Sequence, residues 1–131
     1  NGSTDATVLL VRSMRQKTLR SPQNYGFGGG HNKLIEASQL SDNDWYLAVN
    51  PDAVLAKNYV ETLISSLLQH QAGWGSGKLM LTKGVMYSAG HAYTWDGYAW
   101  NIGYGQMDNG KRVVREVFGV PGAAAMYRHA I

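Results

Sequence analysis

The chain has 131 residues, of which 44% are hydrophobic, with no cysteine and a formal net charge of +3. This composition is that of one globular domain, and the lack of cysteine excludes disulfides, thiolate nucleophiles and cysteine-ligated zinc. The basic residues are scattered and no apolar run reaches the roughly 18 residues of a membrane-spanning helix, so we expect no nucleic-acid partner and no spanning segment.

The first half of the chain predicts alternating helices and strands. The expected elements are, in chain order, a helix capped by Ser3 or Thr4, a short strand at 17–20, a helix from about Gly30, a buried strand at 45–50 and a helix at 57–70. This alternation is typical of an α/β fold with a mostly parallel sheet and covering helices.

From Gly73 to Gly122 glycine and aromatic residues become frequent, and the β-like runs become short. We expect an irregular, partly antiparallel β region attached to the α/β half. Its runs lie at 78–82, 85–90 and 112–120, and the stretch from Gly122 forms either a strand or the start of a helix. No repeat or linker divides the chain, so we expect one domain over 1–131.

A glycine-rich stretch, NYGFGGGHN at 24–32, follows the first expected strand. A glycine loop between a strand and a helix turns backbone N–H groups toward an anion, and phosphate is the common guest. The spacing matches neither the dinucleotide fingerprint G-x-G-x-x-G nor the P-loop G-x-x-x-x-G-K-[ST]. A tightly turned surface loop is the alternative. We expect His31 at the N-terminus of the second helix, beside the glycines.

The segment NPDAVL at 50–55 places Asp52 just past the expected buried strand. Open α/β sheets bind ligands at that end of their strands. A carboxylate there can bind Mg²⁺ or Mn²⁺ together with substrate phosphates. In the alternative interpretation, Asp52 caps the following helix, aided by Pro51.

Aromatic residues alternate with small and polar ones late in the chain. They are Trp95, Tyr98, Trp100 and Tyr104. Exposed rings with carboxylate and amide neighbours suit stacking on sugar rings, and a buried aromatic cluster under a loop is the alternative.

Five segments are informative when they are considered together. They are NGSTD at 1–5, NYGFGGGHN at 24–32, WYLAVNPDAVL at 45–55, SAGH at 88–91 and EVFGVPGAAAMYRHAI at 116–131. In this order and at these separations they resemble a bacterial family 2 glycosyltransferase of the inverting type, most closely its rhamnosyltransferase-like branch. The resemblance implies a GT-A-type, Rossmann-like α/β/α sandwich that transfers a sugar from a nucleotide-diphosphate donor to a hydroxyl acceptor with inversion.

The resemblance places NPD at the family's metal-binding Asp-x-Asp motif. Asn50 stands where the first Asp is common, and Asp52 matches the second and would bind Mg²⁺ or Mn²⁺ against the donor diphosphate. The residues implied at the nucleotide-sugar are Asn1, Gly2, Ser3, Gly28, Gly29, Gly30, His31, Asn32, Asn50 and Asp52, and those implied on the acceptor side are Gly122 and Ala123. The nucleotide-binding half is thus expected at 1–72 and the acceptor-side half at 73–131.

Some parts of the family pattern have no counterpart in this sequence. These are the family's first strand, an Asp before Asn1, and an acidic Glu-Asp motif after Ile131 that supplies the general base. We therefore expect the chain to be the central part of a catalytic domain, truncated at both ends. Its catalytic base is unknown, since nothing assigns that role to the acids of the second half, which are Asp96, Asp108 and Glu116.

The alternative to an enzyme is a nonenzymatic nucleotide- or carbohydrate-binding fragment that self-associates through exposed sheet edges. For the enzyme, the implied partners are a nucleotide-diphosphate sugar and a glycan or lipid-linked acceptor, in polysaccharide or cell-envelope glycan synthesis. The implied location is cytoplasmic, including peripheral association with the inner face of the membrane.

Overall fold

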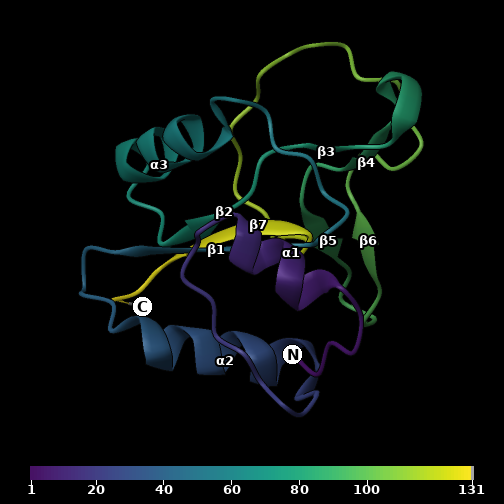
Figure 1. The fold of residues 1–131 in the computed structure, drawn as a ribbon. Coiled ribbons are helices and arrows are strands. Elements are labelled where there is room, and N and C mark those ends of the chain that lie inside the picture. The colour runs from purple at the N-terminus through teal and green to yellow at the C-terminus, as the bar shows by residue number, and fades with distance from the viewer. Residues whose placement is uncertain (131) are drawn as a thin grey trace. The chain divides into compact units, whose positions relative to one another are not determined.

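The computed structural model describes residues 1–130, with Lys83 described by its backbone alone. These residues form two compact units, which we call unit 1, Asn1–Asp42, and unit 2, from Asn43 onward. Unit 1 contains two helices, and unit 2 contains a further helix and the strands (Figure 1).

Unit 1 consists of α1, Thr7–Ser13, and α2, Gly26–Ser38, with the loops around them. The first N–H of α1 is bound by Asp5, whose Oδ1 accepts it at 3.0 Å. The expectation of a cap at Ser3 or Thr4 is therefore wrong. Residues 17–20 form no strand, because the described part of unit 1 has no other strand with which they could pair.

The glycine-rich stretch forms the start of α2 and is not a loop before it. The helix begins at Gly26, where φ is +69°, and it includes Gly28–Gly30. A glycine inside a helix costs about 1 kcal/mol relative to alanine, so a packing reason is needed. At Gly30 the reason is Asn1, because a Cβ there would lie 2.9 Å from Asn1 Nδ2.

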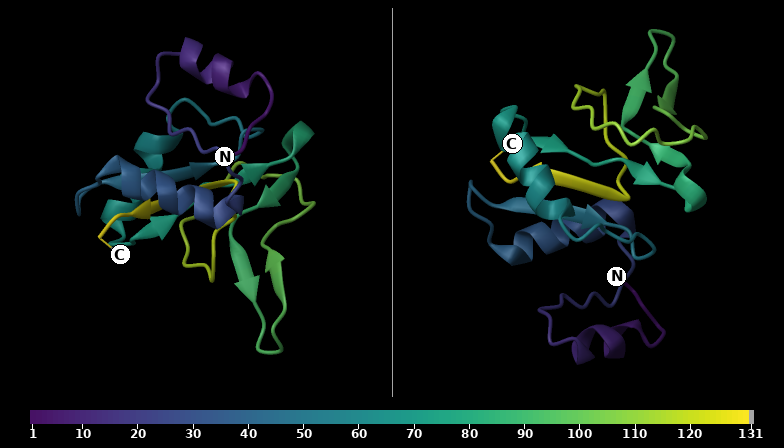
Figure 2. Two further views of the ribbon diagram at one scale, coloured as in Figure 1. Left: turned by 60° about the horizontal axis from the view of Figure 1, so that its bottom comes forward. Right: turned by 90° about the horizontal axis from the view of Figure 1, so that it is seen from above.

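Unit 2 builds a three-stranded central sheet and two smaller antiparallel pairs, β3 with β4 and β5 with β6. Its elements are, in chain order, β1 (Trp45–Val49), α3 (Tyr59–Gln69), β2 (Trp74–Gly75), β3 (Leu79–Met80), a 3-10 helix (Thr82–Gly84), β4 (Met86–Ser88), β5 (His91–Tyr93), β6 (Ala99–Asn101) and β7 (Ala124–Arg128). The β5–β6 hairpin projects away from the central sheet (Figure 2).

The central sheet has the order β1-β7-β2, and both of its pairings are antiparallel. The expectation of a mostly parallel sheet is therefore wrong for the described strands. Because β1 and β2 both run opposite to β7, they run in the same direction, and α3 connects them as a crossover helix. The parallel pair expected between residues 17–20 and 45–50 is absent, because residues 17–20 form no strand, and β7 lies between β1 and β2 (Figure 1).

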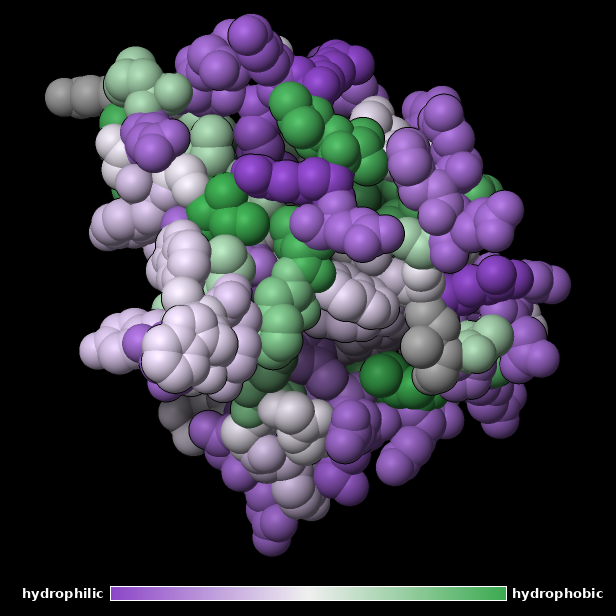
Figure 3. Space-filling view, turned by 180° about the vertical axis from the view of Figure 1, so that it is seen from behind, coloured by the Kyte–Doolittle hydropathy of each residue, from purple (hydrophilic) through white to green (hydrophobic). Residues whose placement is uncertain are grey.

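The buried residues of unit 2 gather around β7. Ala124 and Ala125 are fully buried, and Met126 is 1% exposed. On α3, Leu67 is buried above β2, since a Cβ on Gly75 would lie 2.7 Å from Leu67 Cδ2. The glycine therefore permits the helix to pack closely on the strand. Elsewhere, apolar side chains reach the surface in patches between hydrophilic ones (Figure 3).

Several expected elements of unit 2 are confirmed. The strand at 45–50 and the helix at 57–70 are present as β1 and α3, and the runs at 78–82 and 85–90 contain β3 and β4. The run at 112–120 forms no strand and makes only an isolated bridge from Gly119 to His91. The final stretch forms strand β7, so the expected halves 1–72 and 73–131 share one sheet.

Candidate functional site

A tight turn after β1 carries Asp52. It spans Asn50–Ala53, and its last N–H donates to its first carbonyl oxygen at 3.0 Å; we call it the β1 turn. Pro51 occupies the second position, where its fixed φ suits such a turn. Because α3 begins only at Tyr59, Asp52 does not cap this helix, and the alternative interpretation of the carboxylate is excluded.

A second turn leads into β7. It spans Pro121–Ala124, and its last N–H donates to its first carbonyl oxygen at 3.4 Å; we call it the β7 turn. Its two central residues are Gly122 and Ala123, which are the residues that the resemblance implies on the acceptor side. Pro121 before them is buried, so the turn has a fixed base.

The sheet brings these two turns together. The antiparallel register sets Val49, the last residue of β1, opposite Ala124, the first residue of β7. The Asn50 N–H then donates to the Ala123 carbonyl oxygen at 2.9 Å and joins the turns directly. The structure thus places the turn that carries Asn50 and Asp52, the latter expected at the metal, beside the turn that carries Gly122 and Ala123, expected on the acceptor side.

Tyr59 supports this arrangement from the first residue of α3. Its hydroxyl donates to the Ala124 carbonyl oxygen at 2.8 Å and accepts the Gly77 N–H at 3.0 Å. Burial raises the pKa of the Tyr59 hydroxyl above its ordinary value, so the group remains protonated and able to donate. The sequence does not indicate this role, because Tyr59 has the spacing of an ordinary residue on the apolar face of a helix.

Asp52 is exposed, and none of the side chains that the structure describes pairs with its carboxylate. No group of three or more His, Asp or Glu side chains among these residues could hold a metal ion by itself. An accessible single carboxylate fits an Mg²⁺-type ion that takes its other oxygen ligands from substrate phosphates and water. Asn50, half-buried beside it, can add one neutral amide oxygen.

Unit 1 holds a second group of the expected residues. The Asn1 side chain donates from Nδ2 to the Gly26 carbonyl oxygen at 2.8 Å and accepts the Tyr25 N–H on Oδ1 at 2.9 Å. Gly2, with φ of +73°, donates its N–H to the Ser21 carbonyl oxygen at 3.1 Å. The chain start and the glycine-rich helix are therefore adjacent.

His31 and Asn32 lie inside α2 and not at its N-terminus, because the helix starts at Gly26. The expected position of His31 is therefore wrong. Its ring contacts Phe27 edge-on with the centroids 4.3 Å apart, at the i to i+4 spacing of one helix face. Asn32 is exposed.

A shallow hollow of about 140 Å³ opens between α1 and the loop that follows it. The residues that line it are Asn1, Ser3, Thr7, Val8, Val11, Arg12, Thr18, Leu19, Arg20 and Ser21. Two arginines and several hydroxyl groups suit an anionic or hydrogen-bonding guest. Ligand pockets usually measure about 300–1,000 Å³, so this hollow fits only a part of a nucleotide-sugar.

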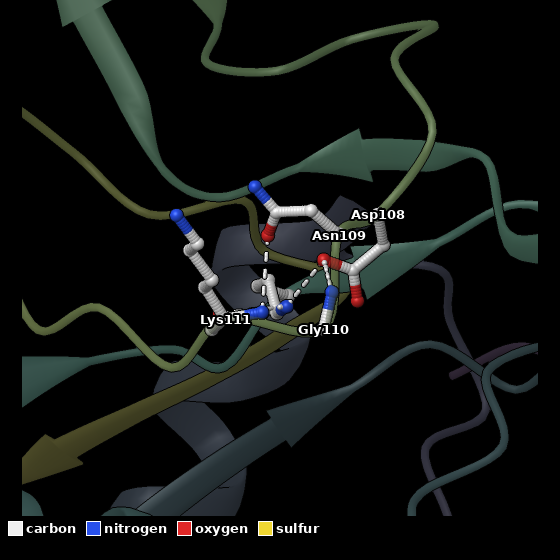
Figure 4. A network of polar contacts seen from close by, with 5 residues as sticks. Asp108, Asn109, Gly110 and Lys111 are labelled. Atoms are coloured by element: carbon white, nitrogen blue, oxygen red, sulfur yellow. Dashed lines mark hydrogen bonds and ion pairs between the residues drawn. The ribbon is translucent and has the colours of Figure 1, made fainter.

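Asp108 is bound in a network of polar contacts (Figure 4). Lys78 Nζ donates to its Oδ1 at 2.6 Å and to the Lys111 carbonyl oxygen at 3.2 Å. The hydrogen bond from Lys78 lowers the pKa of Asp108. A carboxylate whose pKa is lowered is a weak proton acceptor, which argues against Asp108 as the general base.

Unit 2 is an α/β structure in which an exposed carboxylate lies in the turn after β1, and this turn is hydrogen-bonded to the turn that begins β7. Such a site is typical of ligand-binding α/β proteins. The family model for glycosyl transferase family 2 matches residues 1–131, and the chain belongs to this family. Searches among curated proteins and among solved structures find no match.

Family membership confirms the expectation of a glycosyltransferase with a nucleotide-sugar donor and an acceptor as its partners. The observed mixture of helices and strands agrees with the α/β class of the family. Among the described residues, no helix is long and apolar enough to cross a bilayer. The joint action of the unit 1 residues and Asp52 on one donor stays a prediction.

Proposed function

We propose that the chain transfers a sugar, with inversion at the anomeric carbon, from a nucleotide diphosphate to a hydroxyl group of an acceptor. The observation that carries this proposal is the hydrogen bond from Asn50 to Ala123, which sets the exposed Asp52 beside the β7 turn. The family match over residues 1–131 supports the same reaction class.

The reaction joins two substrates at one carbon atom. The acceptor oxygen forms a bond to the anomeric carbon while the bond from this carbon to the diphosphate oxygen breaks on the opposite side. The nucleotide diphosphate leaves with the electron pair, and the hydroxyl proton passes to a base. With the donor diphosphate at the β1 turn and the acceptor at the β7 turn, two adjacent rigid turns would position the reacting atoms.

We propose Mg²⁺ or Mn²⁺ as the cofactor, held by Asp52 and by the phosphates of the donor. When bound, such an ion supplies positive charge that stabilises the departing diphosphate. Asp52 binds and orients the diphosphate end of the donor in this scheme. Asn50 contributes a neutral amide, so the protein itself supplies one negative charge to the site.

In unit 1 we propose that Asn1, Gly2 and Ser3 contact the nucleotide together with the start of α2. The support is that Asn1 is hydrogen-bonded to the first turn of α2 and that the hollow beside it carries Arg12 and Arg20. The glycines at 28–30 have no side chains, so a ligand could approach the backbone of α2 closely there. His31 and Asn32 follow on the same helix.

The finer assignment follows the resemblance of the motifs. We propose a rhamnosyltransferase-like enzyme of bacterial polysaccharide or cell-envelope glycan synthesis, acting in the cytoplasm at the inner face of the membrane. A lipid-linked glycan acceptor would bring the enzyme to that surface. The net charge of +3 is compatible with an anionic phospholipid surface.

The metal assignment is tested by Asp52→Asn. Calorimetric titration of UDP, dTDP and GDP in the presence of Mn²⁺ should show affinity that falls at least about tenfold in the variant, because the charge opposite the metal is lost. Glu61→Gln removes an exposed carboxylate from α3 and is the matched control, for which no change is expected. Equal Mn²⁺-dependent affinity in wild type and Asp52→Asn would overturn the assignment.

The same titration compares the contributions of His31 and Asp52 to nucleotide affinity. His31→Ala should weaken nucleotide binding by less than Asp52→Asn does, because a half-buried helix residue supplies at most one polar contact. A thermal-shift screen of UDP-, dTDP- and GDP-sugars with Mn²⁺ would identify the donor, since a ligand of the native state raises the apparent stability.

A further inference from the structure

The β5–β6 hairpin is a surface that the proposed transfer does not use. Four of its aromatic side chains are exposed: Tyr93 by 51%, Trp95 by 99%, Tyr98 by 74% and Trp100 by 49%. The alternative of a buried aromatic cluster is therefore wrong for these residues. Large exposed rings on a projecting element indicate a binding surface (Figure 2).

The turn of the hairpin is held by several hydrogen bonds. Thr94 donates its N–H to the Tyr98 carbonyl oxygen at 2.8 Å, and the Tyr98 N–H donates to Thr94 Oγ1 at 3.1 Å. Gly97, with φ of +91°, donates its N–H to the Thr94 carbonyl oxygen at 3.0 Å. Trp95, inside this turn, is thus presented on a defined backbone, which lowers the entropic cost of binding.

The two faces of the hairpin differ. Ala92 lies opposite Trp100 in the strand register, and Thr94 is hydrogen-bonded to Tyr98. Because side chains alternate along a strand, Tyr98 and Trp100 share one face and lie about 7 Å apart. Their neighbours across the hairpin, Thr94 and Ala92, are small. On the other face Tyr93 stacks on Phe118, with ring centroids 4.5 Å apart and planes at 13°.

The residues between the rings select the kind of ligand. Residues 91–101 include none of the 12 lysines and arginines of the chain, and their acidic residue is Asp96. They include no aliphatic side chain larger than alanine. A segment that enters an anionic membrane surface carries basic and large apolar residues. Aromatic faces mixed with Thr, Asp and Asn instead match a neutral ligand with C–H faces and hydroxyl groups.

The base of the hairpin lies close to the β7 turn along the chain. His91 donates its N–H to the Gly119 carbonyl oxygen at 2.8 Å and accepts the Phe118 N–H at 3.0 Å. Gly119 precedes Pro121, the first residue of the β7 turn, by two residues, which span at most about 7 Å. A ligand on the hairpin can therefore extend toward the site where the acceptor hydroxyl is expected.

We propose that Tyr98 and Trp100 on one face of the hairpin, together with Trp95 in its turn, bind a neutral pyranose chain, which is the glycan part of the acceptor. This inference rests on the proposed transfer, because it names the chemistry of one substrate and the element that holds it. Tyr and Trp supply a rigid contact area with little loss of side-chain entropy, and the neighbouring polar groups bind the hydroxyls of the sugar.

The test is a fluorescence titration of the full chain with four neutral tetrasaccharides, built of glucose, galactose, mannose or rhamnose. Wild type should bind at least one of them, and Trp95→Ala and Tyr98→Ala should each weaken that binding about tenfold. The control is Tyr127→Ala, which removes a β7 ring that is 39% exposed outside the hairpin and should leave the affinity unchanged. Circular dichroism verifies the fold of each variant.

Several results would overturn the inference: no binding of any tetrasaccharide by wild type, unchanged affinity in Trp95→Ala, or loss only of binding to phosphatidylglycerol vesicles in that variant. Trp95-dependent dimerisation without sugar binding would also overturn it. Mn²⁺-dependent nucleotide titration of the same samples separates the two proposals. If wild type binds nucleotide but no sugar, the hairpin proposal alone is contradicted. If wild type binds sugar but no nucleotide, the proposed transfer reaction alone is contradicted.

Discussion

The two units of the molecule are stabilised in different ways. Unit 2 buries Ala48, Leu67 and the β7 residues Ala124–Met126. In unit 1 no residue is buried to that degree, and an apolar side chain such as Leu9 is 71% exposed. The residues expected at the nucleotide are ordered there mainly by hydrogen bonds from Asn1. The β1 turn and the β7 turn thus rest on a packed core, whereas the residues proposed at the nucleotide rest on local polar contacts, which open more easily.

The largest expected effect comes from truncating the core of unit 2. Met126→Ala should lower the free energy of unfolding by about 2–5 kcal/mol, because it removes a buried side chain and leaves a cavity. Leu9→Ala, a comparable truncation in unit 1, should change it by about 0.5 kcal/mol or less. Urea denaturation followed by tryptophan fluorescence measures both variants. Equal losses would contradict the contrast between the units.

The next effect concerns the hydroxyl that links α3 to β7. Tyr59→Phe should lower the free energy of unfolding by about 1–3 kcal/mol, because the Ala124 carbonyl and the Gly77 N–H lose their partner. Tyr104→Phe is the control, since its ring is 63% exposed. Urea denaturation measures both variants. If both had the same free energy of unfolding as wild type, the Tyr59 hydrogen bonds would make no contribution to stability.

The same hydroxyl predicts a pH dependence. Because the pKa of Tyr59 is raised in the folded state above its ordinary value of 10.0, the unfolded chain loses this proton first as the pH rises. Stability should therefore fall above about pH 10. Denaturation of wild type and Tyr59→Phe between pH 8 and 11, about the ordinary tyrosine pKa, should show a shallower fall in the variant.

A smaller and local effect is expected from Asn1→Ala. The variant loses the hydrogen bonds to Gly26 and Tyr25, each worth about 1 kcal/mol. Hydrogen exchange should accelerate at the amides of the first turns of α2 and stay unchanged in β7. Acceleration that extended to β7 would show that the two units unfold together and would contradict their separate stabilisation.

The smallest effect is expected from Asp108→Asn. The pKa of Asp108 is lowered below its ordinary value of 3.8 by the Lys78 hydrogen bond. The contribution of the pair is present above that value and is lost as the pH falls through the lowered pKa. The variant should therefore show a slightly flatter acid limb of stability than wild type. The pKa of Asp108 can be measured by NMR titration of its carboxyl carbon. An ordinary pKa would contradict this assignment.

The elements with a clear repeat could be predicted from the sequence, and those set by distant contacts could not. The spacing of Leu63 and Leu67 indicates α3, and the apolar run from Trp45 indicates β1. The insertion of β7 between β1 and β2 depends on pairing across the whole of unit 2, which no local pattern contains. The helical state of the glycines could not be predicted because glycine disfavours helices, and the contact of Asn1 that requires a glycine at position 30 has no local sequence pattern.

For the candidate site, the resemblance named the residues and the structure supplied part of the geometry. The proximity of Asn50 to Ala123 follows from the β1–β7 register, which the sequence does not encode locally. The sequence does not indicate the role of Tyr59, because the backbone groups that its hydroxyl binds, Ala124 and Gly77, are distant in the chain. The exposure of Trp95 likewise required a structure, since alternating aromatics occur both in cores and on surfaces.

The register of β7 against β1 has a consequence for evolution of the site. A slip of one residue would shift one turn past the other by about 3.4 Å and would turn the inward side chains of β7 to the opposite face. Met126, which is 1% exposed, opposes such a slip, because its large side chain would have to leave the buried position that it occupies. Substitutions at Met126 would therefore shift the β1 turn relative to the β7 turn without changing a residue of either turn, and turn alignment and core composition should change together in descendants of this chain.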